Sequence, residues 1–244
     1  MALTRRACVA ALAALTVPAQ AQQPSGFLAA RPNLAPPQPP APRPGEFRPL
    51  GLAGRDAILY APKNFSAAVA MPLLVMLHGS GDDARSAAAG LAPQADARGF
   101  LVLAPSSRKS TWDLRHAPAC EDATFIDGAL ARVFASARVD ASRIALMGIS
   151  DGASFALSLG LANGDLFRDL LVFSAGYFHP GPVIGHPRIF ISHGRRDRVL
   201  PFSLGERIAA TLTDAGYDVA FRPFDGGHEI PDDGLKAALD RFLG

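Results

Sequence analysis

The pattern of apolar and polar positions from about residue 50 to the end predicts alternating strands and helices. Short apolar runs, typical of strands covered on both faces, alternate with longer stretches that carry apolar side chains on one helical face. The expected strands are Ala57–Tyr60, Pro72–Leu77, Phe100–Ala104, Ile144–Met147, Leu170–Phe173, Arg188–Ser192 and Asp218–Arg222. The expected helices are Ala84–Arg98, Glu121–Arg138, Gly152–Leu161, Ser203–Ala215 and Gly234–Phe242. Repeated strand–helix–strand units indicate an α/β fold with a mainly parallel sheet and helices on both faces.

The first 21 residues have the pattern of a leader that is removed after export. Met1–Arg6 carries two positive charges, and Ala7–Val17 is an apolar run of 11 residues, too short to span a bilayer. Ala19-Gln20-Ala21 matches an A-x-A cleavage site. We therefore expect residues 1–21 to be a signal peptide, the protein to be exported to the periplasm or secreted, and the mature chain to have no integral membrane segment.

Residues 22–49 are rich in proline, with nine prolines between Pro24 and Pro49. Such a composition does not build a core and favours an extended or disordered chain. We expect a linker here, acting as a spacer, and one domain over residues 50–244.

Composition narrows the class of protein and of partner. The chain has 244 residues, 49% hydrophobic and 19% charged, which fits a globular domain with a sizeable core. The formal charge of +2 comes from Arg5 and Arg6, because without the leader 22 basic residues face 22 acidic ones. A neutral mature chain gives no electrostatic reason to expect a nucleic acid as partner.

The segment Gly148-Ile149-Ser150-Asp151-Gly152 is the first candidate for chemistry. It follows a predicted buried strand and opens a predicted helix, with Val139–Ser142 expected to be the turn before that strand. Gly-x-Ser-x-Gly in this setting is typical of a nucleophile elbow, a strained turn that exposes the serine hydroxyl above the sheet. The glycines leave room for the backbone to pass close to its neighbours.

Reactive side chains follow other strands as well. His78-Gly-Ser-Gly-Asp82, His193-Gly-Arg-Arg-Asp197 and Asp225-Gly-Gly-His228 each come directly after a predicted strand. Ligand sites of such sheets lie at the carboxyl ends of the strands. The order Ser150, Asp197, His228 along the chain is the triad order of α/β hydrolases.

From about residue 52 onward, these segments resemble a small α/β-hydrolase serine esterase. The resemblance is to carboxylesterase/phospholipase-like and polyhydroxybutyrate-depolymerase-like esterases, and it implies an α/β-hydrolase fold with a minimal lid or none. It also implies that Ser150 is the nucleophile, His228 the base, and Asp197 the acid that orients His228. The backbone N–H groups of Ser80 and Asp151 would form the oxyanion hole. The acidic residue at position 151 departs from the family's more common choices, but that position contributes only a backbone N–H.

Other histidines and acids of the chain are candidates for the same roles. His228 is favoured because it follows the last strand on a Gly-Gly loop, whereas His78 and His193 directly follow strands and are expected to support the site. Asp197 is favoured over Asp225, which is too close in sequence to His228. The histidines lack metal-ligand spacing and the 78–81 segment lacks the lysine of a P-loop, so we expect no metal and no cofactor.

The substrate is less well defined by the sequence. Trp112 either stacks on a substrate ring or packs in the protein, and Tyr177 and His179 follow a strand end and are candidates to line the pocket. No insertion is long enough for a large lid, which favours small, bulky or polymeric esters over long-chain fats. The natural ester and the oligomeric state are not predicted.

Two other functions share these features. A serine peptidase of the same fold would have the same triad, and a secreted binding protein could keep the fold without activity. The intact set of Ser150, Asp197 and His228 argues against the binding protein, and the lack of a second substrate-selecting domain argues against the peptidase.

Overall fold

The structure is a computed structural model that describes residues 26–32, 37–38, 40–113, 121–179 and 181–244. Its strands are β1 Phe47–Pro49, β2 Ala57–Tyr60, β3 Met71–Leu77, β4 Leu101–Pro105, β5 Val139–Ile149, β6 Asp169–Phe173, β7 Arg188–Gly194 and β8 Val219–Phe224. Its helices are α1 Ala84–Arg98, α2 Glu121–Ser136, α3 Asp151–Ala162, α4 Phe202–Asp214 and α5 Asp232–Leu243.

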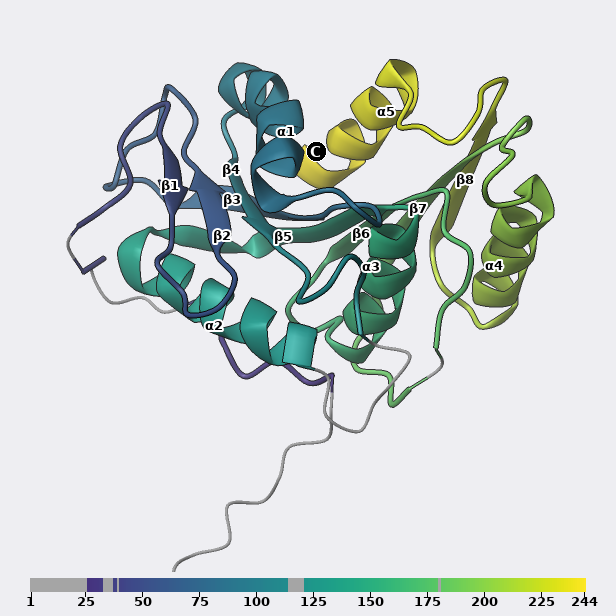
Figure 1. Cartoon of the computed structure of the whole chain (residues 1–244), viewed down its shortest axis with the longest axis horizontal. Helices are drawn as coiled ribbons and strands as arrows, with labels where there is room; N and C mark the ends of the chain where they lie inside the picture. The colour runs from purple at the N-terminus through teal and green to yellow at the C-terminus, as the bar shows by residue number, and fades with distance from the viewer. Residues whose placement is uncertain (1–25, 33–36, 39, 114–120, 180) are drawn as a thin grey trace, which may run out of the picture.

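These strands form a single sheet in the order β1-β2-β4-β3-β5-β6-β7-β8 (Figure 1). β2 is antiparallel to both of its neighbours, and every other pair from β4 to β8 is parallel. The α/β architecture with a mainly parallel sheet is therefore confirmed. Parallel strands place their carboxyl ends at one edge, so the residues that follow β3, β5, β7 and β8 gather there.

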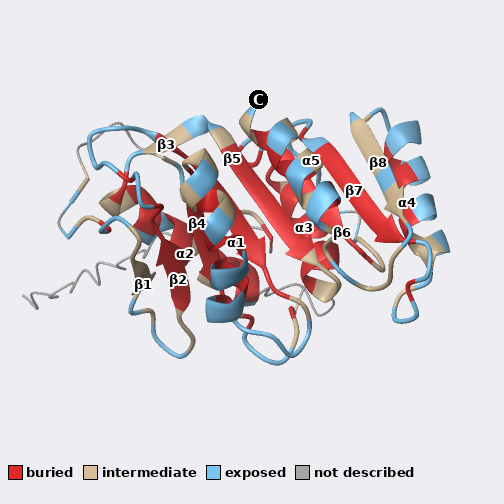
Figure 2. Cartoon of the chain, turned by 90° about the horizontal axis from the view of Figure 1, so that it is seen from above, coloured by how far each residue is buried: buried red, intermediate tan, exposed pale blue. Residues whose placement is uncertain are grey.

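Both faces of the sheet are covered by helices, as the continuous apolar strands predicted (Figures 1 and 2). In β3, Leu73, Val75 and Leu77 pack in the cluster that holds α2, α3 and α4. The alternate residues Leu74 and Met76 pack on the other face, with α1 and α5. All seven residues of β3 are buried, which explains why its sequence shows no alternation of apolar and polar positions.

The predicted helix Ala84–Arg98 is confirmed to the residue, because strong end signals flank it. The Asp83 carboxylate accepts the N–H of Ser86 at the start, and Gly99 ends the helix with a φ of 73°. The prediction of a turn over Val139–Ser142 is wrong: these residues begin β5, and Val139 pairs with Met71 before the register shifts. The Asp140 carboxylate accepts the N–H of Ser142, the kind of local bond that makes Asp and Ser common in turns, so this stretch of strand resembles a turn in sequence.

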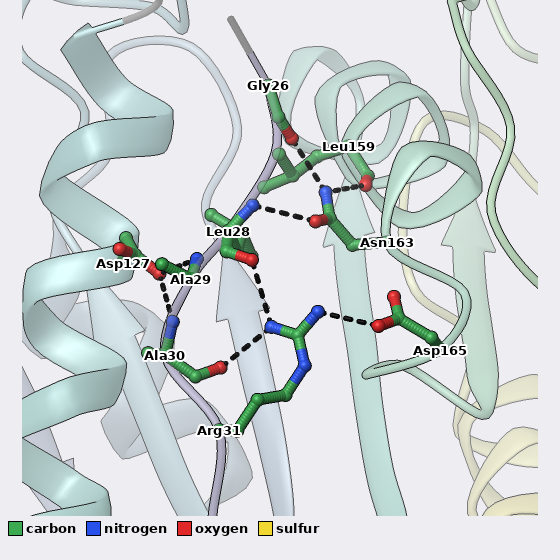
Figure 3. A network of polar contacts seen from close by, with 9 residues as sticks. All are labelled: Gly26, Leu28, Ala29, Ala30, Arg31, Asp127, Leu159, Asn163 and Asp165. Carbon is green, nitrogen blue, oxygen red and sulfur yellow. Dashed lines mark hydrogen bonds and ion pairs between the residues drawn. The ribbon is translucent and has the colours of Figure 1, made fainter. Parts of the chain in front are cut away.

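The described parts of the proline-rich segment are attached to the domain. β1 pairs with β2 at the edge of the sheet, where the missing N–H of Pro49 is tolerated. Upstream, residues 26–31, here called the N-terminal strap, lie across α2 and the end of α3 (Figure 3). Leu28 is only 3% exposed and belongs to the core. The core therefore begins well before residue 50, the start that the sequence suggested.

Polar contacts hold the N-terminal strap at each step. The Asn163 side chain accepts the N–H of Leu28 at 2.8 Å and donates to the carbonyl of Gly26 at 2.7 Å. The Asp127 carboxylate of α2 accepts the N–H groups of Ala29 and Ala30, the two residues after Leu28 (Figure 3). No sequence pattern pointed to Asn163, because its partner Leu28 lies 135 residues away along the chain.

In the part of the chain that the structure describes, no helix combines the length and the hydropathy required to cross a bilayer. The predicted signal peptide, residues 1–21, lies outside the described residues.

Candidate active site

Ser150 lies at the sharp turn between β5 and α3, with a φ of 59° and a ψ of −122°. A serine with positive φ is strained, and this conformation persists only where the surroundings enforce it. Here the Ser150 N–H donates to the carbonyl of Phe173 at 2.9 Å, and its carbonyl accepts the N–H of Ser154. The hydroxyl makes no capping hydrogen bond to the helix that it begins. The backbone is thus fixed while the side chain stays available.

The two glycines of the motif are required by close backbone contacts. A Cβ on Gly148 would lie 2.3 Å from the carbonyl oxygen of Gly152. A Cβ on Gly152 would lie 2.3 Å from the carbonyl oxygens of Leu77 and His78. Any side chain at either position would push β5, α3 and β3 apart. Tight packing of β5, α3 and β3 therefore accounts for both glycines of the Gly-x-Ser-x-Gly motif.

Asp197 and His228 come together from two different strand ends. Nδ1 of His228, after β8, lies 2.7 Å from Oδ2 of Asp197, after β7. The Asp197 side chain is fully buried, whereas that of His228 is 19% exposed. Asp225, the rival acid, faces Arg195 at 4.0 Å instead.

The Asp197 carboxylate is further held by the turn that follows it. Its Oδ1 accepts the N–H of Val199 at 2.8 Å and of Leu200 at 2.9 Å. Burial raises the pKa of this carboxyl, but the hydrogen bonds from His228, Leu200 and Val199 outweigh burial and hold the pKa below its usual value. Asp197 is therefore ionised at neutral pH and favours the Nδ1–H tautomer of His228.

The loop after β3 lies against the nucleophile. A Cβ on Gly79 would lie 3.7 Å from the Cβ of Ser150, which is ordinary contact distance. The next residues are tied down, because the N–H of Gly81 and the hydroxyl of Ser80 both point to the carbonyl of Ser110. His78 is buried, and its Nε2 accepts the N–H of Ser107 at 3.0 Å. His78 thus holds two loops together, in the supporting role predicted for it.

A cleft of about 1300 Å³ opens over Ser150. Ser80 and Asp151 border it next to the nucleophile, and Val199 and Leu200 border it on the side of Asp197. Other lining residues are Arg108, Lys109, Thr111, Trp112, Asp113, Glu121, Ser154, Gly176, Tyr177 and His179. Among the described residues no hydrogen bond joins Ser150 to His228. Such bonds are often long in a ligand-free site and shorten when substrate binds.

The comparisons with known proteins agree with this geometry. The sequence profile of the family described as Phospholipase/Carboxylesterase matches residues 122–243, half of the chain. The chain belongs to the phospholipase/carboxylesterase family of α/β hydrolases. None of the curated proteins compared with it matches.

Solved structures of esterases share the fold of this α/β hydrolase. Esterase PE8 is 25% identical to it over 72% of this chain and 94% of PE8, with a TM-score of 0.61. The fluorophosphonate-binding serine hydrolase F of Staphylococcus aureus, solved with substrate bound, is 15% identical over 82% of this chain and 99% of its own, with a TM-score of 0.67. A phospholipase/carboxylesterase from Dyadobacter fermentans is 20% identical over 84% and 100%, with a TM-score of 0.61.

Trp112 packs inside this α/β hydrolase, which decides between the two alternatives that the sequence left open. Its side chain is buried and stacks on Phe155, with the ring centroids 5.1 Å apart. Its Nε1–H donates to the carbonyl of His78 at 2.9 Å. Trp112 forms part of the cleft wall, but its main contacts are with the protein.

Tyr177 and His179 line the cleft, as the sequence suggested. The Tyr177 hydroxyl donates to Oδ1 of Asp151 at 2.9 Å. The rings of Tyr177 and His179 meet edge to face, with their centroids 5.5 Å apart. The unusual acidic residue of the elbow therefore has a partner, and its side chain is directed along the cleft wall rather than toward the core.

Asp122, at the start of α2, supports the site and was not singled out from the sequence. It is fully buried, and its carboxylate accepts the N–H of Arg108 at 2.7 Å and of Asp113 at 2.9 Å. Burial raises its pKa to about 6. It holds both ends of the loop that carries Trp112. The acidic pair at positions 121–122, beginning a predicted helix, was the available signal. Residues 114–120, between this loop and α2, lie outside the described residues.

Proposed function

We propose that this protein is an exported serine hydrolase that cleaves carboxylic esters through an acyl-enzyme intermediate on Ser150. The observation that carries the proposal is the strained elbow at Ser150 together with the Asp197–His228 pair, all at one edge of the sheet. Membership of the phospholipase/carboxylesterase family supports the same reaction class.

In this proposal Ser150 attacks the ester carbonyl while His228 removes its proton. Serine is a weak nucleophile without such a base. The imidazolium that forms is stabilised by Asp197, whose carboxylate already contacts Nδ1. His228 then returns the proton to the departing alcohol. A water molecule, deprotonated by His228, then attacks the acyl-enzyme; the carboxylic acid leaves, and Ser150 takes its proton back from His228.

The negative oxygen of the intermediate would bind two backbone N–H groups. Asp151 is the first residue of α3, so its N–H has no partner within the helix, and the positive end of the helix dipole points the same way. Ser80 lies in the loop that contacts Ser150 through Gly79. The bonds from this loop to Ser110 hold it rigid, which is what a preorganised donor needs.

The substrate is proposed to be a small or polymeric carboxylic ester. The cleft is lined by mixed polar and apolar side chains, including Arg108, Lys109 and Leu200. Tyr177 and His179 would contact the acyl or alcohol part beyond the reacting carbonyl. The name of esterase PE8 agrees with ester substrates.

Export is part of the proposal and rests on the leader-like sequence of residues 1–21. It predicts a mature chain that begins at Gln22, a few residues before the N-terminal strap. N-terminal sequencing of the protein recovered from the periplasm or the medium tests this, and a retained Met1 would contradict it.

The activity is tested with p-nitrophenyl esters from acetate to palmitate, methyl ferulate and a polyhydroxybutyrate film. We expect hydrolysis by the wild type and its loss in Ser150→Ala. The matched control is Ser154→Ala, a serine of the same cleft whose hydroxyl accepts the N–H of Gly176, and we expect it to remain active. Folded wild-type protein without activity on any ester would contradict the proposal. Peptide panels would then test a peptidase, and inert protein would indicate a binding role.

A further inference from the structure

His193 is a buried histidine that the proposed reaction does not use. It is the sixth residue of β7, its side chain is fully buried, and it precedes Asp197 by four positions. Its Nε2 lies 2.9 Å from the carbonyl oxygen of Leu200 and 3.4 Å from Oδ2 of Asp197. One nitrogen of His193 therefore faces both the acid and the end of the turn that follows it.

The surroundings fix the ring and its tautomer. Both atoms that face Nε2 are acceptors, so Nε2 must carry the proton. Nδ1 has no hydrogen-bond partner among the described residues. It points at α4, where a Cβ on Gly205 would lie 2.6 Å from it, and the ring of Phe202 meets the imidazole edge to face. The ring cannot turn, and Nε2–H is its only donor.

The two oxygens of Asp197 have different partners. Oδ1 accepts the two backbone N–H groups of the following turn, from Val199 and Leu200. Oδ2 accepts Nδ1 of His228 at 2.7 Å and has His193 as its second neighbour. His193 also holds the carbonyl of Leu200, the residue whose N–H binds Oδ1. Asp197, the turn at Val199 and Leu200, and His193 are thus all in mutual contact.

We propose that His193 is a positioning residue: its Nε2–H holds the Leu200 carbonyl, and through it the turn whose N–H groups orient Asp197, so that Oδ2 is aimed at His228. This inference rests on the proposed function, because positioning matters only if Asp197 and His228 act together. His193 does not touch substrate. A second consequence is that the Val199–Leu200 wall of the cleft is held by the same donor.

The test compares two substitutions of His193 whose side chains have similar length, one with an N–H donor and one without. In His193→Gln the amide nitrogen stands as many bonds from Cβ as Nε2 does, whereas His193→Met reaches as far without an N–H. We expect His193→Met to slow fluorophosphonate labelling of Ser150 and to lower kcat by about tenfold, the size of one lost hydrogen bond of about 1.4 kcal/mol, with KM little changed. His193→Gln should recover most of the rate. Thermal unfolding confirms that each variant is folded.

The same change is then made with Asp197→Asn already present. If His193 acts through Asp197, His193→Met should alter the labelling rate less than about twofold in that background, because coupled residues are not additive. An equal tenfold loss in both backgrounds, or a folded His193→Gln as slow as His193→Met, would overturn the proposal.

A readout without turnover separates this inference from the proposed function. The proton on His228 Nδ1 that faces Asp197 should give a low-field NMR resonance. We expect the resonance to move in His193→Met and to return in His193→Gln, and an unmoved resonance in His193→Met would refute positioning. Wild-type protein that resists labelling would refute the proposed function alone, because the resonance still reports on His193 and Asp197.

Discussion

Replacing Asn163 by alanine should destabilise the whole domain, although Asn163 is remote from Ser150. Its side chain is buried at the end of α3 and donates at 2.7 Å to the carbonyls of both Gly26 and Leu159 (Figure 3). It also accepts the N–H of Leu28 at 2.8 Å. Alanine would leave the Leu28 N–H and the Gly26 carbonyl buried without partners, and would release Leu28 from the core.

The magnitude follows from those unmet groups. A buried polar group that loses its partner costs about 1–3 kcal/mol, so two of them cost roughly 2–6 kcal/mol. For a domain of this size each kcal/mol lowers Tm by about 2–4 °C, which predicts a drop of about 4–24 °C. The matched control is Asp165→Ala, two residues further on. Its ion pair with Arg31 is about 40% exposed on both side chains, and an exposed pair contributes at most about 1 kcal/mol.

The assay is unfolding by urea and by heat, with the mature protein and with a variant that lacks residues 22–32. In the shortened chain the Asn163→Ala change should cost less than about 1 kcal/mol, because the groups that it serves are gone. Two results would refute the reasoning: an Asn163→Ala protein as stable as Asp165→Ala, or the same loss in both chain lengths.

The remaining predictions concern the site. Gly152→Ala should prevent folding or activity, because its Cβ would lie 2.3 Å from two carbonyl oxygens. The control Gly128→Ala, in α2, places a Cβ where nothing lies within 4 Å and should raise Tm slightly. Soluble yield and Tm measure the effect of both substitutions. Asp197→Asn should lower kcat by about 10⁴-fold while leaving the fold intact, as stopped assays and circular dichroism would measure; a loss below about tenfold would exclude Asp197 as the acid. Burial raises the pKa of Asp122 to about 6 in the folded chain, so the folded state favours the protonated carboxyl. The stability that this proton contributes is complete below the pKa of the unfolded chain and is lost as the pH rises through about 6. Urea titrations from pH 4 to 7 should show this decline in the wild type and not in Asp122→Asn, and parallel profiles would contradict it.

The strands from β2 to β8, the helices and the order of the site residues could be predicted because each depends on local pattern, whereas β1 lies in the stretch that was expected to be linker. β3 reads as an apolar run since both faces are covered, and α1 has a capping acid at one end and a left-handed glycine at the other. Ser150, Asp197 and His228 each follow a strand, and parallel strands deliver their ends to the same edge. At that edge Nδ1 of His228 lies 2.7 Å from Oδ2 of Asp197.

The N-terminal strap could not be predicted, because its contacts are remote in sequence. Leu28 lies in a short apolar run, Phe27–Ala30, inside a proline-rich stretch, and the side chain that anchors it is 135 residues downstream. Trp112 was undecided for the same reason, since both Phe155 and the His78 carbonyl come from other elements. The β5 start was misjudged because Asp140 and Ser142 make turn-like bonds inside a strand.

The claim that Ser150 is the nucleophile is tested most directly by mass spectrometry of the protein after treatment with a fluorophosphonate. The account predicts a single adduct that maps to Ser150 in the wild type and is absent in folded Ser150→Ala, with the adduct retained in Ser154→Ala. An adduct on another residue, or unmodified wild-type protein that still hydrolyses esters, would contradict the account.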